Sequence, residues 1–538
     1  MKLLFRSPWL PLTVISTFMI ALLLTLFQRD ASGNWVIGSY SLWGDWSAHL
    51  TFINGFRERG FRWILGSNPL FADTPFQYPF LSHWFTAGFA SLFNLDSIHA
   101  MIYTAAALLA VLPFLVYLFF RSFALEVRPS LMATLAWLMM GGLQIFDSTL
   151  RSDRAVTNQF ESGSVLTSFL LFEWIPQRAF LFGGVVFLTA FILLLRCPGR
   201  PLRWTGMGLI VILPLLHFHS WIAAGVLYLA LAVFPVTGSV HFETRKSTFR
   251  TGGIIAVLSG IITLLILSRP SKFHLSWDLW APGWAQSPDT GLTRAASMNP
   301  LWFWIYNTGL FLPLVFWGII SSRTNPKLRA LWISGLALFI SGMLFRIQPY
   351  FYDNLKIFTY AFLFFAPFFG TTLQRFSGRL LPIALILLFL QCASTARDAR
   401  FLASGGERTT WFSSREISIA EQFKEIRKSP SDLVFTSSSH HHWVPCLTGN
   451  PIFMGYPGWL WSWGISYSYR EKEVFEIWAG RPQALELIRN HGIRYIVFDR
   501  NETIMTHRPN EAFFDQHFKK ILDRDGWVIY SVETKSPS

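Results

Sequence analysis

Charged side chains that can carry out chemistry lie between the apolar runs of this chain. Asp45 is the first, in the stretch SLWGDWSAHLTFINGF at residues 41–56, and His49 follows it four positions later. A carboxylate can activate a hydroxyl group by accepting its proton. Arginine and lysine side chains can hold a phosphate leaving group and stabilise the charge that it gains. The other charged or polar residues of these segments include Asp73, Asp147, Arg151, Asp153, Arg154, Glu161, Glu173, Gln177, Arg178, Arg346, Asp353 and Lys356.

The apolar runs between these segments predict a polytopic α-helical membrane protein. Of the 538 residues, 52% are hydrophobic and only 14% are charged, whereas a soluble protein carries about a quarter charged residues. A bilayer core of about 30 Å requires about 20 apolar residues in a helix. The runs lie near 8–28, 98–120, 130–146, 178–195, 205–218, 220–236, 251–268, 301–320, 330–345, 357–373 and 380–395. Two weaker runs, 80–93 and 164–172, raise the predicted number of spans from eleven to thirteen.

The distribution of basic residues predicts how the chain is oriented. Cytoplasmic loops of membrane proteins carry an excess of lysine and arginine. The net charge of +14 is spread over alternate short loops rather than gathered in one patch, so we predict no nucleic-acid partner. The basic side holds Lys2, Arg6, Arg121, Arg128, Arg196, Arg200, Arg203, Arg245, Lys246, Arg250, Arg323, Lys327, Arg329, Arg375 and Arg379. We therefore place the N-terminus in the cytoplasm and the segments 29–79, 147–177, 269–300 and 346–356 outside.

The tail at residues 396–538 differs from the spans, and an odd number of spans places it outside the cytoplasm. It is polar and mixed in charge, with strand-like runs DLVFTSS, PIFMGY, RYIVFDR and GWVIYSV. Helix-like stretches such as REKEVFEIWAG and PQALELIRNHG alternate with them, the second ending in a glycine typical of a helix C-terminus. We predict a transmembrane domain at 1–395 and a small extracytoplasmic α/β domain at 396–538.

Cysteine and histidine residues do not identify a metal site. The three cysteines, Cys197, Cys392 and Cys446, fit no metal-ligand spacing. The adjacent histidines at 440–442 point to alternate faces of an extended strand, so three in a row rarely bind one metal. In LLHFHSW, at 215–221, we interpret the two histidines as structural residues of a tight outer turn.

Two readings other than catalysis are compatible with this layout. Ion-coupled transporters usually place ionisable groups at the middle of the membrane, and the predicted spans hold no Asp, Glu, Lys or Arg at that depth. This absence disfavours a transporter or flippase for a lipid-linked glycan, which we keep as the alternative to an enzyme. A third reading is a non-catalytic scaffold whose tail binds a partner.

The order of these features resembles the GT-C membrane glycosyltransferases. The most similar patterns are those of the protein mannosyltransferase-like enzymes (glycosyltransferase family 39) and the lipid A aminoarabinose transferases. Their acid shortly after the first span is matched by Asp45 in GDWSAH, and their proline-rich helix by TPFQYPFLSHWFTAGFASLF at 74–93. A second outer acid after the third span is matched by Asp147 or Asp153 in FDSTLRSDRA. The segment FRIQPYFYDNLKIF at 345–358 resembles an outer turn of these enzymes.

The resemblance implies transfer of a sugar from a polyprenyl-phosphate donor to a glycan, lipid or protein acceptor at the outer face of a membrane, such as the bacterial inner membrane. Asp45 would be the catalytic base, supported by Asp147 or Asp153, with Lys356 and Arg346 near the carrier phosphate. We further predict that His49, Arg178 and Asp353 bind substrate. Some members use a divalent metal held by outer-loop carboxylates, which leaves the metal requirement open here. Trp46 stands where family 39 has a second acid, so the subfamily, sugar and acceptor stay open.

Overall fold

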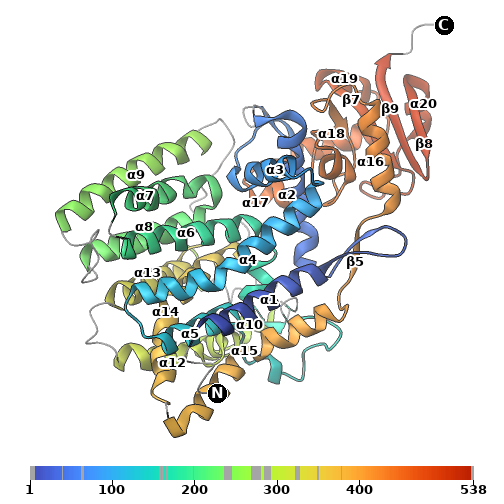
Figure 1. Ribbon diagram of the computed structural model, residues 1–538. Helices are drawn as coiled ribbons and strands as arrows, with labels where there is room; N and C mark the ends of the chain where they lie inside the picture. The colour runs from blue at the N-terminus through green and yellow to red at the C-terminus, as the bar shows by residue number, and fades with distance from the viewer. Residues whose placement is uncertain are drawn as a thin grey trace.

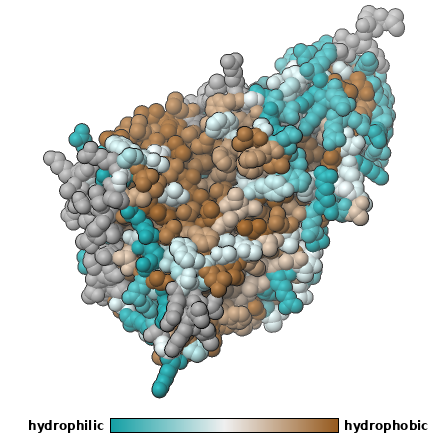
Figure 2. Space-filling model, in the orientation of Figure 1, coloured by the Kyte–Doolittle hydropathy of each residue, from teal (hydrophilic) through white to brown (hydrophobic). Residues whose placement is uncertain are grey.

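The computed structural model describes residues 7–38, 40–61, 66–156, 159, 162–164, 168–197, 199–234, 245–267, 280–283, 293–321, 328–347, 351–376 and 378–534 of the chain. Two parts are visible in Figure 1: a bundle of long helices, and a smaller part of strands and short helices formed by the tail. The bundle presents apolar residues on much of its surface, whereas the tail is mainly hydrophilic (Figure 2). This contrast is expected if the bundle lies in lipid and the tail in water.

The predicted apolar runs form the helices of the bundle. Among the described residues, six helices are long and apolar enough to cross a membrane, or seven if the pair α11 and α12, bent by 98°, forms one broken span. The bundle helices are α1 (Trp9–Leu26), α4 (Ser97–Ser122), α5 (Val127–Leu138), α6 (Arg178–Arg196), α7 (Arg200–Leu216), α8 (Phe218–Val233), α9 (Arg245–Leu267), α11 (Pro300–Thr308), α12 (Phe311–Ser321), α13 (Arg329–Leu344), α14 (Leu355–Gln374) and α15 (Leu381–Ala403). The fold class predicted from the sequence is confirmed.

One of these helices is shorter than its apolar run. The run extends to residue 146, but α5 ends at Leu138 and the chain continues into the short 3₁₀ helix η2 (Leu143–Phe146). At Gly142, a Cβ atom would lie 2.2 Å from the backbone oxygen of Tyr306. The close approach of another backbone at this glycine therefore accompanies the end of the helix.

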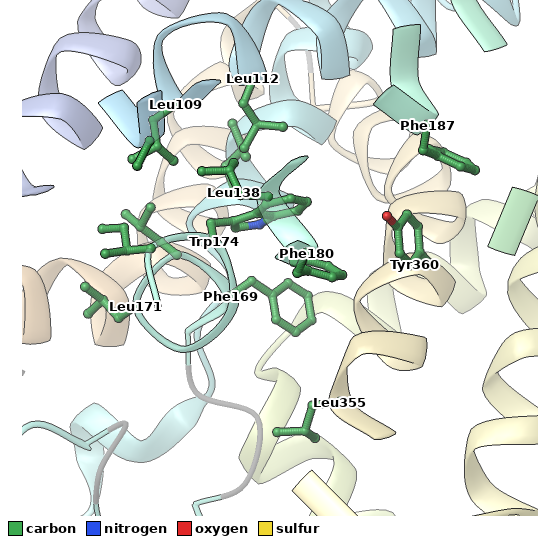
Figure 3. Packing of buried hydrophobic residues seen from close by; sticks show 14 of the residues in the cluster. Leu109, Leu112, Leu138, Phe169, Leu171, Trp174, Phe180, Phe187, Leu355 and Tyr360 are labelled. Atoms are coloured by element: carbon green, nitrogen blue, oxygen red, sulfur yellow. The ribbon is translucent and has the colours of Figure 1, made fainter. Parts of the chain in front are cut away.

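Helix α14 is the centre of the bundle, because almost all of its residues are buried. It packs against α5, α12 and α13, and a Cβ at Gly318 or Gly370 would lie 2.2 Å from a backbone oxygen of the facing helix. Small residues allow membrane helices to approach this closely. Aromatic rings fill the space beside α14, where Phe180 lies 5.5 Å from Tyr360 between ring centroids (Figure 3).

The outer loops are folded against the end of the bundle. The weak run at 80–93 becomes helix α3, and the run at 164–172 ends in a π-helix, η5. Helix α2 ends at Arg59, and the next residue, Gly60, adopts φ +71° and donates its N–H to the backbone oxygen of Phe56, a common helix C-terminus. These outer elements are β1 (Phe27–Arg29), β2 (Trp35–Ile37), α2 (Tyr40–Arg59), β3 (Ser67–Asn68), β4 (Phe71–Pro75), α3 (Leu81–Leu92), η5 (Leu170–Trp174), α10 (Thr293–Ser297) and η10 (Phe351–Asn354). The short 3₁₀ helix η11 (Gly378–Leu380) lies between α14 and α15, on the predicted cytoplasmic side.

The tail forms a four-stranded sheet with strand order β6-β7-β9-β8. Strands β6 and β7 are parallel, and the other pairs are antiparallel. Three of the four predicted strands are confirmed, but PIFMGY forms only isolated bridges, and β8 was not predicted. The elements are β5 (Thr409–Phe412), α16 (Ser414–Ile426), β6 (Leu433–Phe435), η12 (Val444–Thr448), α17 (Pro457–Ser462), α18 (Ser468–Trp478), α19 (Ala484–Asn490), β7 (Ile493–Asp499), α20 (Glu511–His517), β8 (Phe518–Arg524) and β9 (Trp527–Thr534).

The tail is attached to the first outer loop by several contacts. Strand β5 pairs with β2, and Arg427 forms an ion pair of 2.6 Å with Glu58 of α2. The side-chain amide of Asn54 donates to the backbone oxygen of Cys446 at 2.6 Å. Helix α15 continues to Ala403, beyond the domain boundary predicted at residue 395, and the division into two domains stays a prediction.

Candidate active site

Asp45 lies near the start of α2, where that helix faces the segment that precedes α6. The side-chain amide of Gln177 donates a hydrogen bond to the Asp45 carboxylate. The indole N–H of the next residue, Trp46, donates to the backbone oxygen of Ile175 at 3.3 Å. Two neighbouring residues of α2 are thus fixed to one short segment, which holds the carboxylate in place.

Lys356 is the cation of this site. It lies in the first turn of α14, and its Nζ is 2.5 Å from Oδ1 of Asp353 in the preceding η10 turn. Lys356 is also within electrostatic range of Asp45, Glu173 and Tyr78. The structure therefore brings one predicted base and two predicted substrate-binding residues into a single cluster.

Glu173 joins this cluster and was not among the predicted site residues. It is 1% exposed, and neither carboxylate oxygen has a hydrogen-bond partner in the described structure. It lies in η5, and π-helical turns are frequent at functional sites. The signal in the sequence was an acid inside the apolar stretch LLFEW, where a charge is costly without a function.

The cluster contains more acids than bases, and this affects their ionisation. Burial raises the pKa of Asp45 to about 7, with Lys356 opposing the shift and Asp353 adding to it. Burial likewise raises the pKa of Glu173 to about 8. A carboxyl group with a pKa near neutrality can accept a proton and release it again in the physiological range. The carboxyl group of Asp45 can therefore gain and lose a proton near neutral pH.

His49 forms a pair with His83 of α3, a residue that the sequence did not single out. Their Nδ1 and Nε2 atoms are 2.7 Å apart, and both residues are buried. Burial lowers the pKa of His83 to about 3 and that of His49 well below its usual value. Both rings are therefore neutral at pH 7, so the pair can exchange hydrogen bonds but carries no charge for a phosphate.

Arg178 is buried at the start of α6 and is surrounded by internal acceptors. It donates to the backbone oxygen of Met101 at 2.5 Å and to the hydroxyls of Thr86 and Thr104 at 2.9 and 3.0 Å. Its guanidinium also lies 5.2 Å from the ring centroid of Trp46. These contacts join α3, α4 and α6 behind Asp45, which suits a positioning residue.

The two other predicted catalytic acids have separate partners. Asp147 forms an ion pair with Arg294 at 2.7 Å and accepts from the hydroxyl of Tyr306 at 2.8 Å. Burial opposes the shift, but hydrogen bonds from Thr149 and Tyr306 lower the pKa of Asp147 to about 2. Asp153 is exposed and pairs with Arg151 at 2.6 Å. Within the described residues, no contact joins either carboxylate to Asp45.

The described part of the structure does not connect Arg346, Glu161 or the predicted outer loop 269–300 to this cluster. Arg346 is half-buried and forms no ion pair with any residue that the structure describes, whereas Lys356 is paired with Asp353. Glu161 and most of the predicted outer loop 269–300 lie outside the described residues. The roles assigned to these residues stay predictions.

The histidines at the α7–α8 corner connect to α14. The hydroxyl of Tyr360, one turn after Lys356, is 2.6 Å from Ser220 Oγ, which is 2.8 Å from Nδ1 of His217. His219 Nε2 is buried and has no hydrogen-bond partner among the described residues, and it lies within electrostatic range of Lys356. The outer turn interpreted from the sequence therefore borders the polar cluster.

The described side chains do not fit a metal centre. No group of three or more His, Cys, Asp or Glu side chains is arranged to hold a metal ion in the described part of the chain. The Asp45 carboxylate accepts from an amide, and the acids beside it are accompanied by the Lys356 ammonium.

No protein-family model and no curated protein sequence matches the chain. Several solved structures, however, are similar to this chain in fold. The archaeal oligosaccharyltransferase AglB from Archaeoglobus fulgidus, in complex with an inhibitory peptide and a dolichol-phosphate, has a TM-score of 0.55 and 12% identity, covering 92% of this chain and 70% of that one. ArnT from Cupriavidus metallidurans bound to undecaprenyl phosphate has a TM-score of 0.52 and 13% identity, covering 98% and 99%.

A third similar structure is arabinofuranosyltransferase AftD from Mycobacteria, with a TM-score of 0.54 and 11% identity, covering 92% of this chain and 40% of that one. The three proteins are glycosyltransferases of the GT-C superfamily. This chain has their fold over most of its length, as the resemblance in the sequence implied.

Proposed function

We propose that this protein is an integral membrane glycosyltransferase. It transfers a sugar from a polyprenyl-phosphate-linked donor to an envelope or other extracytoplasmic acceptor. The observation that carries the proposal is the convergence of Asp45, from the first outer loop, with Lys356, from the start of α14. The similar AglB and ArnT structures, with dolichol phosphate and undecaprenyl phosphate, support the donor class.

The reaction is a displacement at the anomeric carbon of the donor sugar. Asp45 accepts the proton of an acceptor hydroxyl while the oxygen of that hydroxyl forms a bond to the anomeric carbon. The bond from this carbon to the phosphate oxygen breaks, and its electron pair leaves with the lipid phosphate. Attack from the face opposite the phosphate inverts the configuration at that carbon.

Lys356 stabilises the negative charge that the lipid phosphate gains. A fixed cation is effective here, because it is already in place when the charge develops and is removed from bulk water. Asp353, at 2.5 Å, orients the ammonium group, and Gln177 orients Asp45. In this scheme Arg346 lies near the carrier phosphate, and Asp147 or Asp153 supports Asp45.

The proposed site lies at the membrane surface. Asp45 and Glu173 lie in segments between the apolar helices, and Lys356 lies in the first turn of α14. A polyprenyl carrier has its tail in the lipid and its phosphate at the surface. We propose that this is the outer surface of a bacterial inner membrane, with the N-terminus in the cytoplasm.

Profiling of lipid-linked sugars in a strain that lacks the protein tests this proposal against the transporter alternative. A transferase leaves its donor unused, so the polyprenyl-phosphate sugar accumulates on the outer face of the membrane. A flippase leaves a lipid-linked glycan on the inner face. Accumulation on the inner face alone would overturn the proposed transferase.

A further inference from the structure

The tail segment YPGWLWSWG at 456–464 lies against the proposed active site. Helix α17 and the residues around it form a row of aromatic side chains, in which the rings of Trp459 and Trp463 are stacked at 6.2 Å with an interplanar angle of 12°. His440 lies 3.3 Å from the ring centroid of Tyr456 and 5.3 Å from that of Trp459. We refer to His440, Tyr456, Trp459 and Trp463 as the aromatic row.

Both ends of the aromatic row reach the Asp45 cluster. At one end, a Cβ atom on Gly44, the residue before Asp45, would lie 3.6 Å from the ring of His440. At the other end, the ring of Trp463 lies 5.5 Å from that of Tyr78, which is within electrostatic range of Asp45 and Lys356. The row therefore borders the catalytic base on the side of the tail.

The aromatic row is not part of the dry core of the tail. Trp443 and Trp478, in the same part of the molecule, are 0% exposed, whereas Tyr456, Trp459 and Trp463 are half-buried. Trp463 packs against the core of the bundle as well as the core of the tail. The row is thus placed at the junction of the two parts, and its rings keep some exposed surface there.

The chemistry of the aromatic row fits a carbohydrate. A pyranose or furanose ring has a face of C–H groups that packs on an aromatic ring, and hydroxyls at its edge that need hydrogen-bond partners. Tryptophan, tyrosine and histidine supply both, since each joins an aromatic face to a polar group. A lipid phosphate would require cations instead, and none of the row residues is one, because burial lowers the pKa of His440 to about 4.

We propose that the aromatic row binds the saccharide part of the acceptor, so that a sugar hydroxyl is presented to Asp45. This inference rests on the proposed function and deepens it, because it makes the acceptor a glycan rather than a peptide or a simple lipid. It also gives a role to the tail, because the bundle binds the donor and the aromatic row binds the acceptor next to Asp45.

Variants at Trp459 of the full-length protein in lipid nanodiscs test this inference. Trp459→Phe keeps an aromatic face, whereas Trp459→Leu fills the space without one. Trp461 provides the matched control, because it is a tryptophan of the same short helix that is 46% exposed and lies outside the row. Trp461→Leu therefore removes an equal side chain without removing a row ring.

The probes are defined oligomers of glucose, mannose, N-acetylglucosamine and arabinose, and their binding is followed by saturation-transfer NMR. We expect at least one oligomer to bind the wild-type protein, the Trp461→Leu variant and, nearly as well, the Trp459→Phe variant. Loss of one aromatic contact in Trp459→Leu should weaken that binding by about 3- to 10-fold. Absence of binding by the wild-type protein, or equal binding by the two leucine variants, would overturn the inference.

Binding of undecaprenyl phosphate, measured on the same samples, separates this inference from the proposed function. All these variants should bind the lipid as the wild type does, because the row lies on the acceptor side. If the wild-type protein bound no lipid phosphate, the proposed function would fail. If it bound the lipid and Trp459→Leu left saccharide binding unchanged, only the role of the aromatic row would fail.

Discussion

Gln177 donates a hydrogen bond to Asp45, and this contact joins residues 132 positions apart in the sequence. A hydrogen bond to the charged form of a carboxylate favours that form and fixes its direction. The amide thus fixes the direction of the proposed base, and it belongs to a segment that lies just after Glu173.

Replacement of Gln177 should therefore reduce turnover without abolishing it. We expect Gln177→Ala to lower kcat by about 10- to 100-fold, because a base displaced by about 1 Å can lose about 100-fold in rate. Gln374→Ala is the matched control, since its amide donates to Glu126 in an exposed contact. Transfer assays on the two purified variants measure the effect, and equal rates would show that Gln177 does not position the base.

The pH dependence of transfer should follow the ionisation of Asp45. Its pKa is raised to about 7 by burial, and only the ionised carboxylate can accept a proton. We expect kcat/KM to fall about tenfold for each pH unit below 7. The charge of Lys356 lowers the pKa of Asp45, so Lys356→Met should raise that pKa and move the fall in kcat/KM to higher pH. A pH–rate profile that is flat between pH 5 and 8 would contradict the assignment.

Loss of the Lys356 ammonium should weaken donor binding. A charge-assisted hydrogen bond contributes about 1.5–3 kcal/mol, so Lys356→Ala should raise the donor requirement by roughly 10- to 150-fold. Arg346→Ala tests the second predicted phosphate contact in the same way. Binding of undecaprenyl phosphate to each variant in nanodiscs provides the measurement, and unchanged affinity in both would remove this pair from the site.

The predicted orientation requires the first outer loop and the tail to lie on the same side of the membrane. Cysteines introduced at Ser67 and Arg508, both exposed, in a chain without its natural cysteines should react with an impermeant maleimide in intact cells. A cysteine at Arg250, on the predicted cytoplasmic side, should react only after lysis. Labelling of one outer site without the other would show that the number of spans between them is odd.

Much of the fold follows from the sequence, because hydropathy is a local property. The apolar runs predicted the helices of the bundle, and the position of Asp45 after the first run marked it as a candidate site residue. Glu173 was not predicted as a site residue, since the charged residues near it, Asp45, Asp353 and Lys356, are far away in the chain. His83 could not be paired with His49 for the same reason.

The predicted pairing of Asp45 with Asp147 or Asp153 also shows that the sequence does not reveal which distant residues meet. Asp147 follows α5 in a place that resembles the second acid of GT-C enzymes, yet the structure pairs it with Arg294 and Tyr306. Position along a chain places a residue on one face of a membrane, but not beside a given neighbour. The tryptophans in and just after α17 show it as well, because the contact of Trp463 with Tyr78 joins segments far apart in the chain.

The most direct test of the account is glycosyl transfer by the Asp45→Asn variant. This change keeps the size of the side chain but removes the oxygen that accepts the proton of the acceptor. General-base catalysis contributes about 10²–10⁴-fold, so we expect transfer by this variant to fall by at least about 100-fold, with membrane insertion and undecaprenyl phosphate binding retained. Asp45→Glu should restore little activity, because the base would be displaced. If Asp45→Asn protein, present at the wild-type level, transferred sugar at the wild-type rate, Asp45 would not be the base and the central claim would be wrong.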